Sequence, residues 1–339
     1  MQDAMANRPH GLMFHHFHGT GFAPSQGSID ADTFERILAH YAQSHRVLDA
    51  DEYLQRALSG ELGPRDVCIT FDDSLLCQYD VALPVLERHG LHAFWFIYSG
   101  VIAGRIEPLE VYRRYRSEYF DDIDGFYAAF FKALARSPHA DTAATALCDF
   151  VPRHYLAEFP FYTDNDRRFR YLRDIVLSSS GYDDVMTLMM DASGTSATEL
   201  AEGLWIGAEQ LRMLHQAGHV IGLHSHTHPT MLAALPADLQ LREYTDNQQI
   251  LANILGATPN TMSHPCNSYD DVTLDGLRSL GIELGFRSNM SPAPPSALEH
   301  PREDHANIVK RLGLCPTSPA VTSARVLPGS TERRLGSIC

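Results

Sequence analysis

The chain has 339 residues, a formal net charge of −15 at pH 7 and 44% hydrophobic residues. This length allows one large α/β domain, or a domain with an insertion, to bury a full core. The negative charge disfavours nucleic acids and anionic membrane surfaces as partners, because phosphate binding needs clustered Lys and Arg.

The cysteines and the first residues favour a cytoplasmic location. None of the six cysteines forms a C-x-x-C pair, so we expect mostly reduced thiols. The N-terminal stretch has no basic segment followed by an apolar one, and no window is long enough to span a membrane.

In chain order, the first expected elements are a strand around "MFHHFHG" (13–19) and a helix in "DADTFERILAHY" (30–41). The next elements repeat one unit: an amphipathic helix, a glycine, an apolar strand and then polar residues. The units cover 81–100, 211–229 and 274–289. Alternating helices and strands predict a parallel sheet, whose polar C-terminal edge carries the chemistry.

This alternation breaks between about residues 105 and 200, where aromatic and basic residues are interleaved in helical stretches. We interpret 105–199 as an inserted helical subdomain. Its aromatic residues either pack it onto the main domain or form a lid or sugar-binding wall. Residues 316–339 are rich in Pro, Ser and Thr, which predicts a loosely ordered tail.

"IGLHSHTHPTM" places three histidines at positions 224, 226 and 228, where a predicted strand ends. Histidines four residues apart meet one metal ion if the chain curls, and period 2 aligns all three if it stays extended. The alternative is a solvated turn.

"ITFDDS" places Asp72 and Asp73 directly after another apolar strand. In isolation, these residues or Ser74 would serve as caps of a helix that starts near Leu75. Combined with the histidines, they predict a three-ligand Asp/His/His site with an open position for water and a neighbouring carboxylate as base.

These two motifs resemble those of the NodB-homology polysaccharide deacetylases, carbohydrate esterase family 4, over roughly residues 10–104 and 200–315. The resemblance implies a distorted (β/α) barrel with Asp72 as general base. It also implies one divalent metal, usually zinc, held by Asp73, His224 and His228. His226 falls at a variable position, where a turn residue is expected.

The third motif of the family departs most, since "SHPCNSY" has Ser263 in place of the arginine that orients the base. His264 is a candidate to take part of that role, and Asn267 occupies the position of the glycine. The oxyanion donor would be the backbone N–H near Cys266, which does not depend on the side chain.

The last motif of the family supplies a histidine as general acid, and "EHPREDHANIVKRL" contains the candidates. We choose His305, with Asp304 as its orienting partner and Arg302 as the substitute arginine. Near the N-terminus, strand alternation separates His16 and His18 from His15, and we take His16 to line the pocket.

The expected function is therefore metal-dependent removal of an acetyl or formyl group from an amino sugar in surface polysaccharide or O-antigen biosynthesis. The expected substrate is nucleotide- or lipid-linked. Two alternatives remain: a hydrolase of a non-carbohydrate C–N bond on the same fold, and a catalytically impaired sugar-binding protein that keeps the metal for stability.

Overall fold

The computed structural model describes residues 8–157 and 162–314, and its centre is one parallel sheet of eight strands. Seven strands follow the order β7-β6-β5-β4-β3-β1-β8, and β2 pairs with the first half of β3. The strands are β1 (His10–Phe14), β2 (Arg46–Val47), β3 (Asp66–Phe71), β4 (Phe94–Ile97), β5 (Val220–Leu223), β6 (Thr261–Ser263), β7 (Leu284–Phe286) and β8 (Arg302–Asp304).

The two ends of this sheet nearly meet. The Gly285 N–H of β7 donates to the Ala297 carbonyl oxygen, and the Arg287 N–H donates to that of His300, immediately before β8. A Cβ on Gly285 would lie 2.6 Å from the Leu298 carbonyl oxygen, so only glycine allows this approach. The sheet is therefore a nearly closed barrel, and the expected distorted (β/α) barrel is confirmed.

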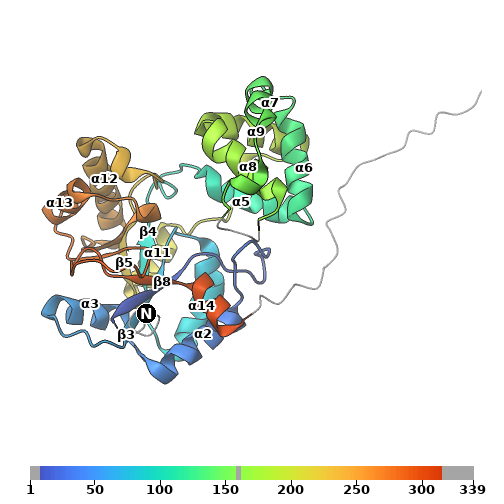
Figure 1. The fold of residues 1–339 in the computed structure, drawn as a ribbon. Coiled ribbons are helices and arrows are strands. Elements are labelled where there is room, and N and C mark those ends of the chain that lie inside the picture. Colours follow the sequence, from blue (N-terminus) through green and yellow to red (C-terminus); the bar gives the residue numbers. More distant parts are fainter. Residues whose placement is uncertain (1–7, 158–161, 315–339) are drawn as a thin grey trace, which may run out of the picture.

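Helices surround the barrel (Figure 1). They are α2 (Ala31–Ser44), α3 (Ala50–Ser59), α4 (Leu83–His89), α11 (Ala208–Gln216), α12 (Ala237–Leu255), α13 (Asp271–Ser279) and α14 (His305–Leu312). Gly90 and Gly256 take the left-handed conformation at the ends of α4 and α12.

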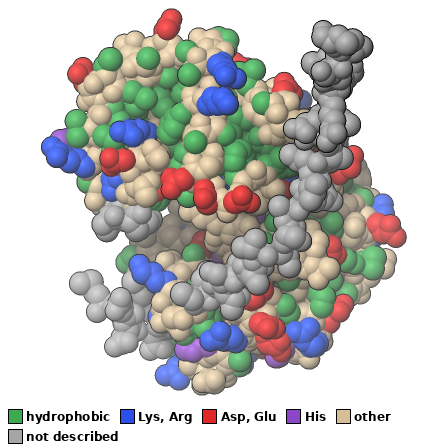
Figure 2. Space-filling view, turned by 90° about the vertical axis from the view of Figure 1, so that its right-hand side faces the viewer, with side chains coloured by type: hydrophobic (Ala, Val, Ile, Leu, Met, Phe, Trp, Pro, Cys, Tyr) green, Lys and Arg blue, Asp and Glu red, His purple; other side chains and the backbone are tan. Residues whose placement is uncertain are grey.

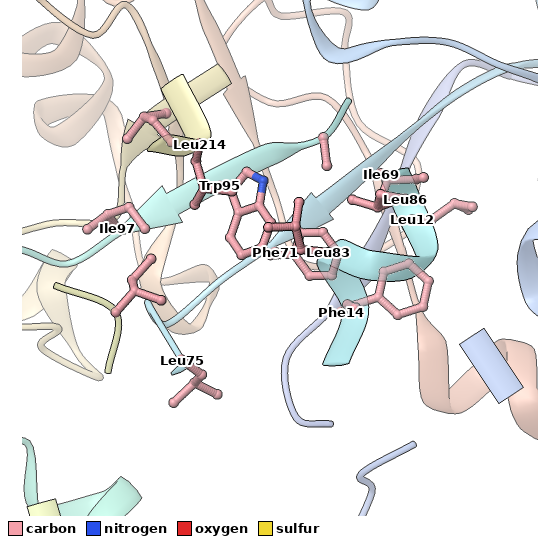
Figure 3. Close-up of a cluster of buried hydrophobic side chains, with 14 of the residues drawn as sticks. Leu12, Phe14, Ile69, Phe71, Leu75, Leu83, Leu86, Trp95, Ile97 and Leu214 are labelled. Carbon is pink, nitrogen blue, oxygen red and sulfur yellow. The ribbon is translucent and has the colours of Figure 1, made fainter. Parts of the chain in front are cut away.

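Apolar residues of the strands and surrounding helices form the main core (Figure 3). The ring centroids of Phe71 and Trp95, which come from neighbouring strands, lie 4.5 Å apart. Phe14 of β1 meets Phe34 of α2 edge-on at 4.8 Å. This packing fixes the strand ends from which the polar residues project.

A separate helical unit is inserted between β4 and α11 (Figure 1). Its helices are α5 (Pro108–Tyr119), α6 (Ile123–Leu134), α7 (Ala140–Cys148), α8 (Asp164–Tyr171), α9 (Ser179–Ala192) and α10 (Ala197–Ala201). Its aromatic residues build a hydrophobic core of its own, including Phe126, Phe130 and Phe169, instead of packing mainly on the barrel. Figure 2 shows a hollow between the two parts on one face.

Two other expectations concern the whole chain. Among the described helices, none is both long and apolar enough to cross a membrane. Cys68, Cys77, Cys148 and Cys266 are free thiols. The tail predicted at 316–339 lies outside the described residues.

Candidate metal-dependent active site

The candidate site lies at the C-terminal edge of the barrel, where the chain turns sharply after three strands. Within the described residues, positive φ angles at non-glycine positions occur here and at Leu156 alone. The residues are Asp73 and Ser74 after β3, Ser225 and His228 after β5, and Cys266 and Asn267 after β6. The left-handed turn at Asp73, with φ of 73°, explains how two adjacent carboxylates serve one site.

Asp73, His224 and His228 form a compact cluster whose ligand atoms all lie within 4.8 Å of one another. Asp73 Oδ1 lies 3.4 Å from Nε2 of each histidine. This oxygen is buried and makes no hydrogen bond, which is the environment of an atom that needs a cation. One carboxylate and two imidazoles also match a catalytic zinc site with open positions, so these residues fit a divalent metal.

Ser263 orients the His224 ring through Nδ1, the ring nitrogen that does not face Asp73. Its Nδ1–H points at Ser263, whose carbonyl oxygen lies at 3.0 Å and whose hydroxyl lies at 2.7 Å. Asn247 of α12 accepts a hydrogen bond from the His224 backbone. With the proton on Nδ1, the Nε2 lone pair faces Asp73, as metal binding requires.

Asp72 faces a different partner from Asp73. Arg302, whose side chain is 0% exposed, donates to Oδ1 and Oδ2 of Asp72 at 2.7 Å each. Burial alone would raise the pKa of Asp72, but the guanidinium of Arg302 and the His224 imidazole outweigh it and lower the pKa. Asp72 is therefore held as a carboxylate beside the cluster, and the substitute arginine has the geometry that the sequence suggested.

β1 and β8 lie close together at Gly11, and the absence of a side chain there leaves space for Arg302. A Cβ on Gly11 would lie 2.9 Å from Arg302 Cγ. The guanidinium continues inward, where Nε donates to the Arg287 carbonyl oxygen and Nη1 donates to the Thr70 hydroxyl. The absence of a side chain at Gly11 thus lets the arginine cross the barrel to Asp72.

Two residues at the arginine and neighbouring positions of the third motif have different roles from those expected. The Ser263 hydroxyl donates to Asp72 Oδ1 at 3.2 Å and contacts His224 Nδ1, so it joins these two residues. His264 does not orient Asp72: its Nε2–H donates to the Leu298 carbonyl oxygen and its ring stacks on Tyr269. Burial lowers the pKa of His264 to about 3. It is a neutral structural residue.

Among the described residues, no hydrogen bond or ion pair joins His305 to the cluster, and its assignment as general acid stays a prediction. Its Nε2–H donates to the Gly27 carbonyl oxygen at 2.8 Å, and its ring stacks on Phe14. Asp304 caps α14 by accepting a hydrogen bond from the Ala306 N–H, and it lies 3.6 Å from His305 Nδ1. Asp304 and His305 are thus held at the start of α14.

His15 lies beside both aspartates. Its Nε2 is 3.9 Å from a carboxylate oxygen of Asp72 and equally far from one of Asp73, and its side chain is 24% exposed. The signal was present in the sequence, because His15 follows β1 as Asp72 follows β3. These strands are neighbours with Phe14 opposite Phe71. Without the strand order, this register was unknown.

The remaining candidates lie around the rim. His16 points toward the insertion, where its Nε2 lies 2.8 Å from Glu110 Oε2 of α5. Asn267 accepts a hydrogen bond from the Ser288 N–H and ties the turn after β6 to the end of β7. His226 is a turn residue whose ring contacts the Ser99 hydroxyl. Cys266 is an exposed free thiol on the turn after β6.

Comparisons with known proteins agree with this geometry. Residues 178–285, which include His224 and His228, match the family model described as polysaccharide deacetylase. The structure is similar to the Streptococcus pyogenes deacetylase PplD in complex with acetate, with 17% identity, a TM-score of 0.51 and coverage of 88% of this chain and 91% of that one.

It is also similar to IcaB from Ammonifex degensii, with 16% identity, a TM-score of 0.51 and coverage of 87% and 91%. At these identities, the likeness shows a shared fold. No curated protein sequence matches the chain.

Proposed function

Since the chain belongs to the polysaccharide deacetylase family, as a divergent member, we propose that it is a metal-dependent hydrolase that removes an N-acyl group from an amino sugar of a surface polysaccharide or its precursor. One observation carries this proposal. The buried Asp73–His224–His228 cluster lies next to Asp72, a second carboxylate that Arg302 keeps charged. A ligand set with a separate base is the equipment of hydrolysis.

Asp73, His224 and His228 would hold the ion, for which zinc is the expected identity. When bound, such an ion acts as a Lewis acid on an acyl carbonyl and lowers the pKa of water. Asp72 then accepts a proton from the attacking water, and Arg302 keeps its carboxylate turned toward the site. His15 donates a proton to the leaving nitrogen as the C–N bond breaks, which releases the carboxylic acid and the free amine.

The main rival is a sugar-binding protein that retains a metal for stability. Asp72 opposes that interpretation, because a structural metal site needs no neighbouring base. The protein instead uses three donors, two on Arg302 and one on Ser263, to hold this carboxylate. Three buried donors on one carboxylate support a catalytic role for Asp72.

The first test is metal content per chain by elemental analysis, with the wild type and His224→Ala purified without added metal. We expect about one divalent ion in the wild type and its loss in the variant. Absence of metal from both proteins, even after incubation with zinc, would refute the hydrolase mechanism.

Activity separates the remaining assignments. Amine release from N-acetyl amino sugars should disappear in Asp72→Asn while metal stays bound, and a metal-loaded wild type without turnover would favour the binding protein. If His15 is the acid, His15→Asn should lower kcat by about 10²-fold or more, whereas His305→Asn should not. A larger loss of kcat in His305→Asn than in His15→Asn would instead assign the general acid to His305.

A further inference from the structure

A pocket opens beside the candidate active site, between the barrel and the insertion. The loop after β1 forms one wall, and helix α5 of the insertion forms the opposite wall. Its lining includes Phe17, Phe22, Ala23, Leu75, Glu110 and Leu204. The pocket therefore exists only where the two parts of the chain face each other.

The pocket and the metal cluster are continuous along the chain. His15 faces the two aspartates, and the next residue, His16, lines the pocket. Likewise, Asp73 belongs to the cluster, and Leu75 lines the pocket two residues later. The residues that flank the cluster therefore continue directly into the lining of the pocket.

The lining favours an uncharged, apolar ligand. Phe17 and Leu75 are buried barrel residues, and Phe22 and Leu204 add further apolar surface. The charged groups here already have partners. Arg113 donates to the Gln26 carbonyl oxygen. Arg114 donates to the carbonyl oxygens of Leu200 and Glu202.

Glu110 and His16 also satisfy each other, with 2.8 Å between their side chains. A phosphate or nucleotide would find no free cation among the described residues of this lining, whereas an alkyl chain would displace water from apolar walls.

We propose that this pocket receives the alkyl part of the substrate's N-acyl group, so that the preferred acyl group is longer than acetyl. This inference rests on the proposed function and names its substrate class. The reacting carbonyl lies at the cluster, and the chain attached to it extends past His16 between the loop after β1 and α5. The insertion then determines which acyl group is removed, while the barrel supplies the chemistry.

The test is hydrolysis of glucosamine carrying N-acetyl, N-butyryl or N-hexanoyl groups. We expect wild-type kcat/KM to rise by about threefold for each added methylene that enters the pocket. Ala23→Phe and Ser117→Phe fill the pocket from its two walls and should abolish this rise, while N-acetyl turnover and metal content remain unchanged. Ala257→Phe, exposed and outside the lining, is the matched control.

A wild-type rate that falls with chain length would overturn the proposal. So would a rise that persists in both filled variants, or a loss that is equal for all chain lengths. A gain for the hexyl glycoside of N-acetylglucosamine, without one for the N-hexanoyl sugar, would assign the pocket to the glycosidic side of the substrate and also overturn it.

A binding measurement separates this proposal from the proposed function. Calorimetry with Asp72→Asn protein should give tighter binding of N-hexanoylglucosamine than of N-acetylglucosamine, and Ala23→Phe in that background should remove the difference. If no N-acyl sugar is hydrolysed by metal-loaded wild type, the proposed hydrolase fails, but this affinity difference still decides the pocket. Equal affinities would refute it.

Discussion

Replacement of Arg302 by methionine should leave a buried carboxylate without its counter-charge. Arg302 is fully buried, and both of its terminal nitrogens lie 2.7 Å from Asp72 oxygens. Removal of one partner from such a pair costs about 3–5 kcal/mol, mostly because the other charge stays buried. We therefore expect Arg302→Met to lower the free energy of unfolding by that amount, and Arg302→Lys, which keeps the charge but loses the fork, by less.

The assay is a double-mutant cycle with Arg302→Met, Asp72→Asn and the double variant, measured by urea unfolding. Chelator-treated protein is used throughout, because a bound metal would add its own stabilisation. The double variant should be about 3 kcal/mol more stable than the sum of the single effects predicts. A coupling energy below about 1 kcal/mol, the value of an exposed ion pair, would refute the argument that Arg302 positions the base.

Three further predictions concern the support of the site and the barrel. Ser263→Ala removes the hydroxyl that contacts both Asp72 and His224, and should weaken metal affinity by about 10- to 100-fold in a competition titration with a chelator. Unchanged affinity would contradict this role of Ser263. Gly285→Ala forces a Cβ against the Leu298 backbone and should destabilise the protein by about 1–3 kcal/mol in thermal unfolding, and an unchanged Tm would contradict the barrel closure. Burial lowers the pKa of His219 to about 4. Between about pH 6.5 and 4, the unfolded chain therefore binds a proton at His219 that the folded protein does not bind, so the free energy of unfolding should fall as pH decreases through this range. In His219→Asn, which retains an acceptor for the Ala93 N–H, the slope of unfolding free energy against pH should decrease by up to about 1.4 kcal/mol per pH unit, and an unchanged slope would refute the assignment.

The repeating helix–glycine–strand units were sufficient to predict a parallel sheet, because parallel strands and their covering helices each leave a periodic apolar pattern, whereas the closure into a barrel was expected only from the family resemblance. An Asp/His/His site was also predictable, since acidic residues and histidines follow the ends of β3 and β5, whereas the choice of Asp73, His224 and His228 came from the family resemblance. The short strands β2 and β8 were not recognised, because two or three residues carry no periodicity. Their places depend on contacts made across the barrel.

The choice between histidines shows where sequence reasoning stops. Strand alternation does not say which histidine meets Asp72, because β1 ends at Phe14 and the rings of His15 and His16 stack with centroids 6.3 Å apart. That depends on β1 lying beside β3 in register, which is a property of the closed sheet. His305 was selected by its place in the chain, whereas the direction of its ring depends on the start of α14 and on the carbonyl group of Gly27.

The inserted helices leave and rejoin the barrel at neighbouring places. The returning segment pairs with the chain just beyond the two aspartates, where the Leu76 N–H donates to the Leu204 carbonyl oxygen and the Ile206 N–H donates to that of Ser74. The insertion also has its own core, and the ligands and the base all come from barrel strand ends. Such an arrangement separates the two parts, because none of the three cluster residues lies on an inserted helix. Related enzymes built this way would diverge in the substrates they select long before they diverge in the reaction they perform.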